Sequence, residues 1–197
     1  MGGRAEPELV AALQAGYERA FAEVVSAHHA ALLRVASAFV PTKAMAEDVV
    51  QDTWLAVVRG IARFEGRSSL RTWLVSIVVN RAKSAGQREH RTIPIDALAE
   101  AADIGGPFAA DGHWLNPPES WTEAVEDRFD AQRATELLSG FLADLPDGQR
   151  QVLVLRDVDG LSSREVCDLL AISEANQRVL LHRARIQMRA RLVGAER

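Results

Sequence analysis

The polar residues best placed for a binding chemistry lie in residues 162–186, in a pattern typical of a helix-turn-helix. Ser162 and Glu165 have the spacing of a capping box, which predicts a short helix that reaches Leu170. A three-residue turn follows, and Ser173 can cap a longer second helix. In a helix-turn-helix this second helix enters the major groove of DNA with its N-terminal end first. The side chains expected to meet base edges or phosphates are Asn176, Gln177 and Arg178, continued along the same face by His182 and Arg185.

Two basic stretches indicate that the chain could meet a polyanion at two separate places. Residues 59–91 hold eight basic side chains and two acidic ones, and residues 175–193 hold five arginines and no acidic residue. The whole chain has a formal net charge of −4, so its basic residues are concentrated locally. The alternative is two solvated helix faces and, for residues 162–186, an ordinary helical hairpin with a basic surface.

Amphipathic helices are needed to position these residues, and the first half of the chain predicts three of them. Apolar residues recur at three- and four-residue spacing through residues 17–39, until Pro41 ends the run. Thr42 can cap a second helix that extends to residue 61 and counts Leu55 and Val58 among its apolar residues. After a polar break around Gly66, a third long helix is expected over residues 69–87.

Residues 91–130 differ in composition from both flanks. Glycines and prolines interrupt any periodicity there, and nine acidic against two basic residues give a net charge of −7. We interpret this segment as a flexible acidic linker, of which Trp114 and Trp121 suggest that a part docks on its own domains or on a partner. Helical periodicity resumes near Ala131, and the sequence has no alternating strand pattern with hairpin turns. The expected fold is therefore all-α, with one small helical domain on each side of this linker.

Length and composition restrict the class of protein further. A chain of 197 residues, 48% of them hydrophobic, can build one average domain or two small ones. The lone Cys167 excludes a disulfide framework and a cysteine-rich zinc site, and we expect it in the core. No apolar run approaches the about 20 residues of a membrane helix, and the N-terminus lacks a signal-peptide core, so a cytoplasmic protein without membrane insertion is expected. The sequence has no glycine-rich phosphate loop and no metal-spaced cluster, so it predicts no cofactor and no metal site, and nothing in it proposes a nucleophile–base pair.

The motifs on both sides of the linker resemble those of one family. Four short motifs, LP at 145, RQV at 150, GLS at 160 and HRAR at 182, resemble region 4 of the sigma-70 family. Residues 46–54 (AEDVVQDTW) and 64–74 (FEGRSSLRTWL), followed by Ile77 and Asn80, resemble region 2 of the same family. Two such domains with only a short linker are similar to the extracytoplasmic-function class of sigma factors. The resemblance covers about residues 9–90 and 131–193.

The resemblance implies a subunit that binds core RNA polymerase and selects promoters, and it assigns two surfaces to region 2. One helix face would bind the β′ clamp helices, because its carboxylates and amide suit a basic partner. That face consists of Asp48, Gln51, Asp52 and Arg59. The loop at residues 64–69 and the helix after it would capture a base flipped from the −10 strand. The residues carried over for this are Phe64, Ser68, Ser69, Arg71, Asn80, Arg81, Lys83 and Arg88.

Within this second set, Asn80 would pair with a base edge and the basic residues would hold the DNA backbone, since phosphate contacts fix position rather than sequence. Phe64 could supply an aromatic wall for the flipped base, and Trp73 is expected to be a core residue.

The resemblance also implies that region 4 binds the polymerase β flap and the −35 duplex. The contacts carried over to the last helix are Ser173, Arg178, His182 and Arg183. This helix departs from the family pattern, because residues 175–180 (ANQRVL) stand where similar factors often have GTVKSR. The linker of such factors threads towards the active-site cleft of the polymerase, so the acidic segment here could mimic nucleic acid. A solvated tether is the other interpretation.

Two other classes of protein remain open at this point. A stand-alone helix-turn-helix regulator would use residues 162–191 and leave residues 48–54 and the loop at 64–69 without a role. A helical adaptor would explain the amphipathic helices, but it would not explain the two basic surfaces. The family resemblance further implies an anti-sigma factor that masks one or both domains.

Overall fold

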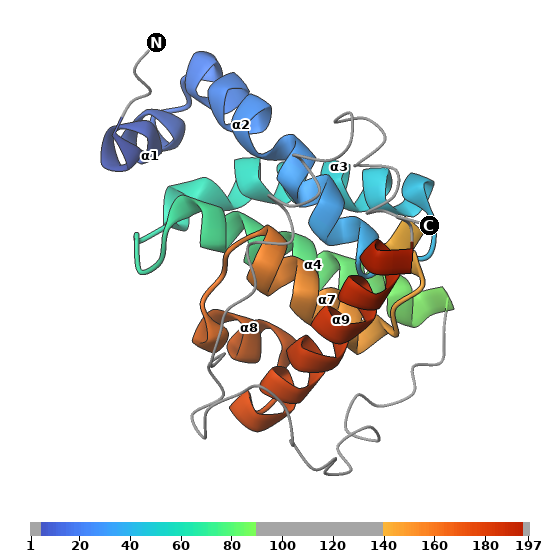
Figure 1. The fold of residues 1–197 in the computed structure, drawn as a ribbon. Helices are drawn as coiled ribbons and strands as arrows, with labels where there is room; N and C mark the ends of the chain where they lie inside the picture. The colour runs from blue at the N-terminus through green and yellow to red at the C-terminus, as the bar shows by residue number, and fades with distance from the viewer. Residues whose placement is uncertain (1–4, 90–139, 195–197) are drawn as a thin grey trace. The chain divides into compact units, whose positions relative to one another are not determined.

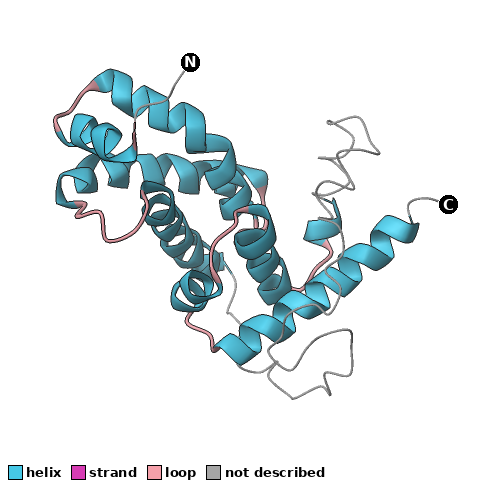
Figure 2. Ribbon diagram, turned by 60° about the vertical axis from the view of Figure 1, so that its left-hand side comes forward, coloured by secondary structure: helices cyan, strands magenta, loops and turns pink. Residues whose placement is uncertain are grey.

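The chain folds into two compact helical units, Met1–Thr92 and Ile93–Arg197. The computed structural model describes residues 5–89 and 140–194, and each unit is described by itself (Figure 1). All regular structure in these described residues is helical, as Figure 2 shows, which confirms the all-α prediction. The expected linker at residues 91–130, with Trp114 and Trp121, lies outside the described residues.

The N-terminal unit is built on three long helices that pack against one another. These are α2 (Glu18–Ser37), α3 (Lys43–Gly60) and α4 (Leu70–Glu89), with the short helix η1 (Ile61–Arg63) after α3. Their buried side chains form one core and, apart from Val57, come from the predicted apolar stripes: Val24, Leu32, Val35, Val50, Val57, Leu74 and Val78. Removing such side chains from water supplies the main stabilisation of the unit. The observed helices differ from the expected spans by one or two residues at their ends.

Local capping explains where two of these helices begin. Thr42 lies just before α3, and its Oγ1 accepts a hydrogen bond of 3.2 Å from the Met45 backbone N–H. The Ser69 hydroxyl accepts a bond of 3.1 Å from the Thr72 N–H in the first turn of α4. Both hydroxyls satisfy backbone donors that have no partner within the helix.

A further helix, α1 (Glu6–Gln14), precedes the three long ones and was not expected from the sequence pattern. It contacts α2 and η1, and its Leu13 side chain is buried. Gly16, with a φ of 78°, forms the corner between α1 and α2. A left-handed backbone of this kind is readily adopted by glycine.

The C-terminal unit contains the predicted helix-turn-helix. After a helical turn at residues 140–143 come α7 (Asp147–Leu153), the π-helical turn η3 (Val154–Val158), α8 (Ser163–Leu170) and α9 (Glu174–Gly194). Helix α9 packs on both α7 and α8. Its inward side chains Leu180, Leu181 and Ala184 are buried, as predicted, and meet a core whose other members include Val152, Leu153, Leu155 and Val166.

The start of α8 has the capping box that the sequence predicted. Ser162 accepts from the Glu165 N–H, and the Glu165 carboxylate accepts from the Ser162 N–H at 2.8 Å. The turn between α8 and α9 begins at Ala171, whose φ of 56° is left-handed although the residue is not glycine. The hydroxyl of Ser173 accepts from the Asn176 N–H at 3.2 Å, so it caps α9 as expected.

Candidate nucleic-acid interface

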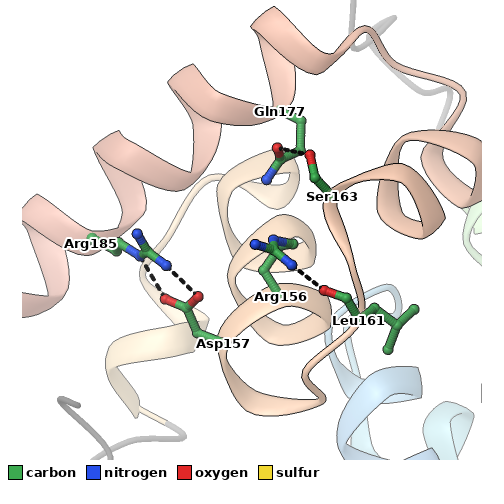
Figure 3. A network of polar contacts seen from close by, with 6 residues as sticks. All are labelled: Arg156, Asp157, Leu161, Ser163, Gln177 and Arg185. Atoms are coloured by element: carbon green, nitrogen blue, oxygen red, sulfur yellow. Dashed lines mark hydrogen bonds and ion pairs between the residues drawn. The ribbon is translucent and has the colours of Figure 1, made fainter. Parts of the chain in front are cut away.

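The two helices of the helix-turn-helix are joined by a hydrogen bond between Ser163 on α8 and Gln177 on α9. The Ser163 hydroxyl donates to the Gln177 side-chain oxygen at 2.9 Å (Figure 3). Only 2% of Gln177 is exposed, and its amide faces the core of the unit. The prediction that Gln177 meets a base edge is corrected here, because a side chain held in this position does not reach the outer surface of α9.

The sequence contained a signal for this burial. Gln177 precedes Leu181, Ala184 and Met188 at intervals of four, three and four residues, and all three of these side chains are buried. Residues at these intervals lie on one face of a helix. The amide is therefore in phase with the core stripe, whereas Arg178 is in phase with the outer face.

Arg185 also has an internal partner, which adds a structural role to the one expected for it. Its Nε and Nη2 atoms lie 2.8 Å and 2.7 Å from the two carboxylate oxygens of Asp157 in η3 (Figure 3). This is a bidentate pair between two largely buried side chains. Beside it, an Arg156 guanidinium nitrogen donates to the Leu161 carbonyl (Figure 3). Arg185 thus ties α9 to the π-helical turn, and its role as a DNA contact stays a prediction.

The other residues of α9 that the sequence assigned to the −35 duplex lie on the more exposed side of this helix. Arg178 is exposed and its nearest acidic partner is Glu174, at 3.2 Å one helical turn earlier. Asn176, His182 and Arg183 are partly exposed. An ion pair between exposed side chains contributes at most about 1 kcal/mol, so the Arg178 guanidinium can exchange Glu174 for a phosphate or a base edge at low cost.

The charge state of His182 follows from its surroundings. Burial lowers its pKa below 6.5, and the guanidiniums of Arg185 and Arg183 lower it further. The imidazole is therefore neutral at neutral pH, and it can act as both a donor and an acceptor of hydrogen bonds.

In the N-terminal unit, the loop at residues 64–69 is largely exposed and begins with an aromatic contact to α4. Phe64 packs against Trp73 of α4, with ring centroids 5.0 Å apart and the planes tilted by 45°. Gly66 has a φ of 70°, and the Glu65 and Arg67 side chains pair across it at 2.8 Å. Ser68 is exposed and Ser69 caps α4. Trp73 is half-buried, and its ring packs against that of Phe64.

The basic and polar residues of α4 that were assigned to DNA differ in their exposure. Arg71 and Asn80 are exposed, and Lys83 is half-buried, with a pKa that burial lowers below its usual range. Arg81 lies 3.6 Å from Asp52 of α3. This contact joins a residue assigned to DNA with one assigned to the polymerase. The side chain of Arg88 lies outside the part of the chain that the structure describes.

The face of α3 assigned to the polymerase is exposed, and it contains two apolar residues of the predicted helix. The side chains of Asp48, Gln51, Asp52 and Arg59 are all exposed. Between them in the sequence, the apolar residues Leu55 and Val58 are 54% and 57% exposed. With about 3.6 residues per turn, all six lie within roughly a third of the helix circumference. The face is thus an apolar pair in a polar surround, which is typical of a protein interface.

The structure adds three observations about other chemistry. Among residues 5–89 and 140–194, no three His, Cys, Asp or Glu side chains are grouped so that they could hold a metal ion. In the same part of the chain, no helix combines the length and apolar character needed to cross a membrane. Burial raises the pKa of the half-buried Cys167 thiol, which makes it less reactive than a free cysteine.

Comparisons with known proteins assign both units. The family model of sigma-70 region 2 matches residues 24–92, and the model of sigma-70 region 4 matches residues 135–188. The chain is 31% identical to the ECF RNA polymerase sigma factor SigM of Mycobacterium tuberculosis, over 97% of this chain and 86% of that protein. It is 30% identical to the RNA polymerase sigma-H factor of Pseudomonas aeruginosa, over 91% of this chain and 90% of that protein. It spans 42% of the length of the probable sigma factor RfaY of Xanthomonas campestris, at 31% identity.

Two solved structures are similar in fold. CnrH in complex with the cytosolic domain of CnrY has a TM-score of 0.60 at 24% identity, and covers 98% of this chain and all of that one. The sigma factor RpoE of Bartonella quintana, in complex with the anti-sigma factor NepR, has a TM-score of 0.59 at 21% identity, over 87% and 96% of the chains. The two units, a helical one followed by a helix-turn-helix, correspond to regions 2 and 4 of the sigma-70 family models. The chain belongs to the extracytoplasmic-function sigma factors of the sigma-70 family.

Proposed function

We propose that this chain binds core RNA polymerase through α3 and directs it to promoters, reading the −10 strand with the N-terminal unit and the −35 duplex with α9. The exposed face of α3 carries this proposal. A stand-alone helix-turn-helix regulator has no use for an apolar pair flanked by carboxylates in a second unit. Synthesis of RNA belongs to the polymerase, so the chain itself acts as a specificity subunit, in the cytoplasm.

Polymerase binding would centre on Leu55 and Val58. Apolar residues at the centre of an interface supply most of its energy when water is excluded, while a polar rim contributes orientation. The rim here includes Asp48 and Asp52, whose carboxylates suit a basic partner helix such as the β′ clamp helices. Because Asp52 also lies near Arg81, docking on this face would alter the charge next to the −10 residues.

At the −10 element, the loop at residues 64–69 and α4 would hold the non-template strand. Arg71 and Lys83 supply positive charge for its phosphates, and the exposed Asn80 amide can pair with the edge of an unpaired base. Taking a base out of the duplex costs a few kcal/mol, and a pocket that receives the base repays this cost. Phe64 is already packed on Trp73, so it would offer the outer edge of its ring to such a base.

At the −35 element, Asn176 and Arg178 at the N-terminal end of α9 would enter the major groove. Asparagine pairs with adenine and arginine with guanine. Arg183 and His182 lie further along the same helix and would contact the phosphate backbone, and Ser173 would lie at the cap where backbone N–H groups favour an anion. The β flap of the polymerase would contact this unit.

We further propose control by an anti-sigma factor. One structure of similar fold is a sigma factor bound to an anti-sigma factor. An inhibitor that covers Leu55 and Val58 would compete directly with the polymerase, since a face of this kind accommodates one partner at a time.

The experiment is a co-purification with core RNA polymerase followed by run-off transcription. We expect Leu55→Asp to abolish binding to the core enzyme, because it introduces a charge at the centre of the apolar pair. Asp48→Arg should weaken binding by reversing a rim charge. Glu23→Arg, which reverses an exposed carboxylate on α2, is the matched control and should bind normally.

Two results would count against this function. If Leu55→Asp and Glu23→Arg co-purify equally well with the core enzyme, α3 is not the docking face. If the unaltered chain does not bind the core enzyme but binds closed duplex in a salt-sensitive way, the stand-alone regulator is the better interpretation.

A further inference from the structure

Helix α1 is hydrogen-bonded to both ends of the loop at residues 64–69. Near its C-terminal end, the Gln14 side-chain amide donates to the Phe64 carbonyl at 2.9 Å and to the Ile61 carbonyl at 3.2 Å. At its N-terminal end, the Glu6 carboxylate accepts from the Leu70 backbone N–H at 2.9 Å. The loop therefore starts and finishes on the same short helix, although 50 and 64 residues separate the paired positions.

The Glu6 contact completes the cap of α4. The first N–H groups of a helix have no partner within it, and they carry the positive end of the helix dipole. Ser69 satisfies the Thr72 N–H from within the loop, whereas the Leu70 N–H is satisfied from α1. A carboxylate at this point is favourable in charge as well as in hydrogen bonding.

The loop itself has little else to fix its shape. Glu65, Gly66, Arg67 and Ser68 are exposed, and Gly66 adopts a left-handed backbone that other residues rarely tolerate. The ion pair between Glu65 and Arg67 is exposed to solvent, so it contributes little. The positions of the two ends must therefore determine how the loop is presented.

Helix α1 can set those positions because it is a rigid spacer. Glu6 and Gln14 are eight residues apart in a continuous helix, which corresponds to about 12 Å at 1.5 Å per residue. Both side chains bind backbone atoms at the ends of the loop. They therefore constrain where the loop lies, and they do not require particular side chains within it.

We propose that α1 is a brace for the −10 reading loop, and that Glu6 and Gln14 are positioning residues for capture of the unpaired −10 strand. This inference rests on the function proposed for the loop. Neither residue touches DNA in this mechanism. They act by holding Phe64 and the first turn of α4, which carries Arg71, in the geometry that receives the strand. Loss of either contact allows the loop to sample other conformations, and ordering it again reduces the affinity for the strand.

The test compares full-length variants in complex with core RNA polymerase. The probe is a fluorescent single strand that covers the −10 element mapped by run-off transcription with the unaltered chain. We expect Glu6→Ala and Gln14→Ala each to weaken strand binding about fivefold, which corresponds to about 1 kcal/mol. Affinity for the core enzyme and for the −35 duplex should stay unchanged. Glu6→Gln keeps an acceptor oxygen and should retain most of the binding.

Two control variants separate positioning from loss of stability. Glu8→Ala removes another exposed carboxylate from the first turn of α1, and it should bind the strand like the unaltered chain. Thr42→Ala removes the cap of α3 in the same unit, and it leaves Glu6 and Gln14 in place. If the brace is a positioning device, Thr42→Ala lowers the melting temperature without weakening strand binding.

The proposal is overturned if Glu6→Ala and Gln14→Ala bind the strand as tightly as Glu8→Ala. It is also overturned if Thr42→Ala loses as much strand affinity as they do for the same fall in melting temperature. Failure of the unaltered chain to bind the strand in the polymerase complex would refute the function of the loop itself, and the brace with it.

Discussion

The pair of Asp157 and Arg185 allows a decisive test of which arginines on α9 serve the fold and which serve DNA. The two side chains form a bidentate pair at 2.7 Å and 2.8 Å, and only 11% of Asp157 and 26% of Arg185 remain exposed. Asp157→Ala would leave the guanidinium partly buried without its carboxylate. Such a group is costly because it has lost its water as well as its partner.

The magnitude follows from that burial. Removing one partner of a fully buried ion pair costs about 3–5 kcal/mol, and solvent that reaches a quarter of Arg185 reduces this to about 2 kcal/mol. For a unit of this size, we expect the melting temperature to fall by about 8–16 °C. The double variant Asp157→Leu with Arg185→Met replaces both charges with apolar groups of similar size. It should recover most of the stability, because no unpaired charge remains.

Thermal unfolding followed by circular dichroism measures the loss of stability in Asp157→Ala and its recovery in the double variant. The affinity of the polymerase complex for a −35 duplex at 20 °C measures whether Arg185 also contacts DNA. The double variant should bind the duplex as the unaltered chain does. If it instead loses as much affinity as Arg178→Ala, Arg185 contacts DNA in addition to its contact with Asp157. Substitutions at ordinary surface positions change the free energy of unfolding by less than about 0.5 kcal/mol. If Asp157→Ala lowers that free energy by no more than this, the pair has no structural role.

Other residues of α9 give three further predictions. Arg178→Ala should weaken −35 binding by about 1–3 kcal/mol, the usual cost of losing a bidentate base contact, as measured by fluorescence anisotropy; an unchanged affinity would remove it from the reading set. Gln177→Leu should cost about 1 kcal/mol of stability in urea unfolding and leave the base preference unchanged, since the amide is buried; an altered preference would restore it as a DNA contact. The lowered pKa of His182 means that the unfolded chain binds a proton more tightly than the folded unit, so stability should decline as pH falls below 6.5. His182→Gln should flatten that decline.

Features of the fold that depend on neighbouring residues were predictable from the sequence. The caps at Thr42, Ser162 and Ser173 use a side chain and a backbone group three residues later, so the local pattern contains all the information they need. The buried stripe of α9 was predictable for the same reason. Helix α1 was not, because its contacts with residues 61–70 join positions that are distant in the chain.

The candidate site was less predictable, because residue type does not reveal orientation. Leu55 and Val58 fit an apolar stripe as well as their buried neighbours do, yet no helix within residues 5–89 covers these two side chains. Arg185 has the same phase on α9 as Arg178, and its partner Asp157 lies 28 residues earlier. Gln177 is the exception, because its four-residue spacing from the buried Leu181 already indicates the core face of α9.

The long reach of α1 also has a consequence for the order in which the chain can fold. The Glu6 contact closes a span of 64 residues, whereas the Ser163 contact with Gln177 closes one of 14. By the logarithmic dependence of closure entropy on length, the longer span costs about 1.3 kcal/mol more, and distant contacts also form more slowly. On the ribosome, α1 emerges well before the residues that it holds. The reading loop can therefore settle only after Leu70 has left the exit tunnel, while the helix-turn-helix can assemble as soon as its own short segment is free.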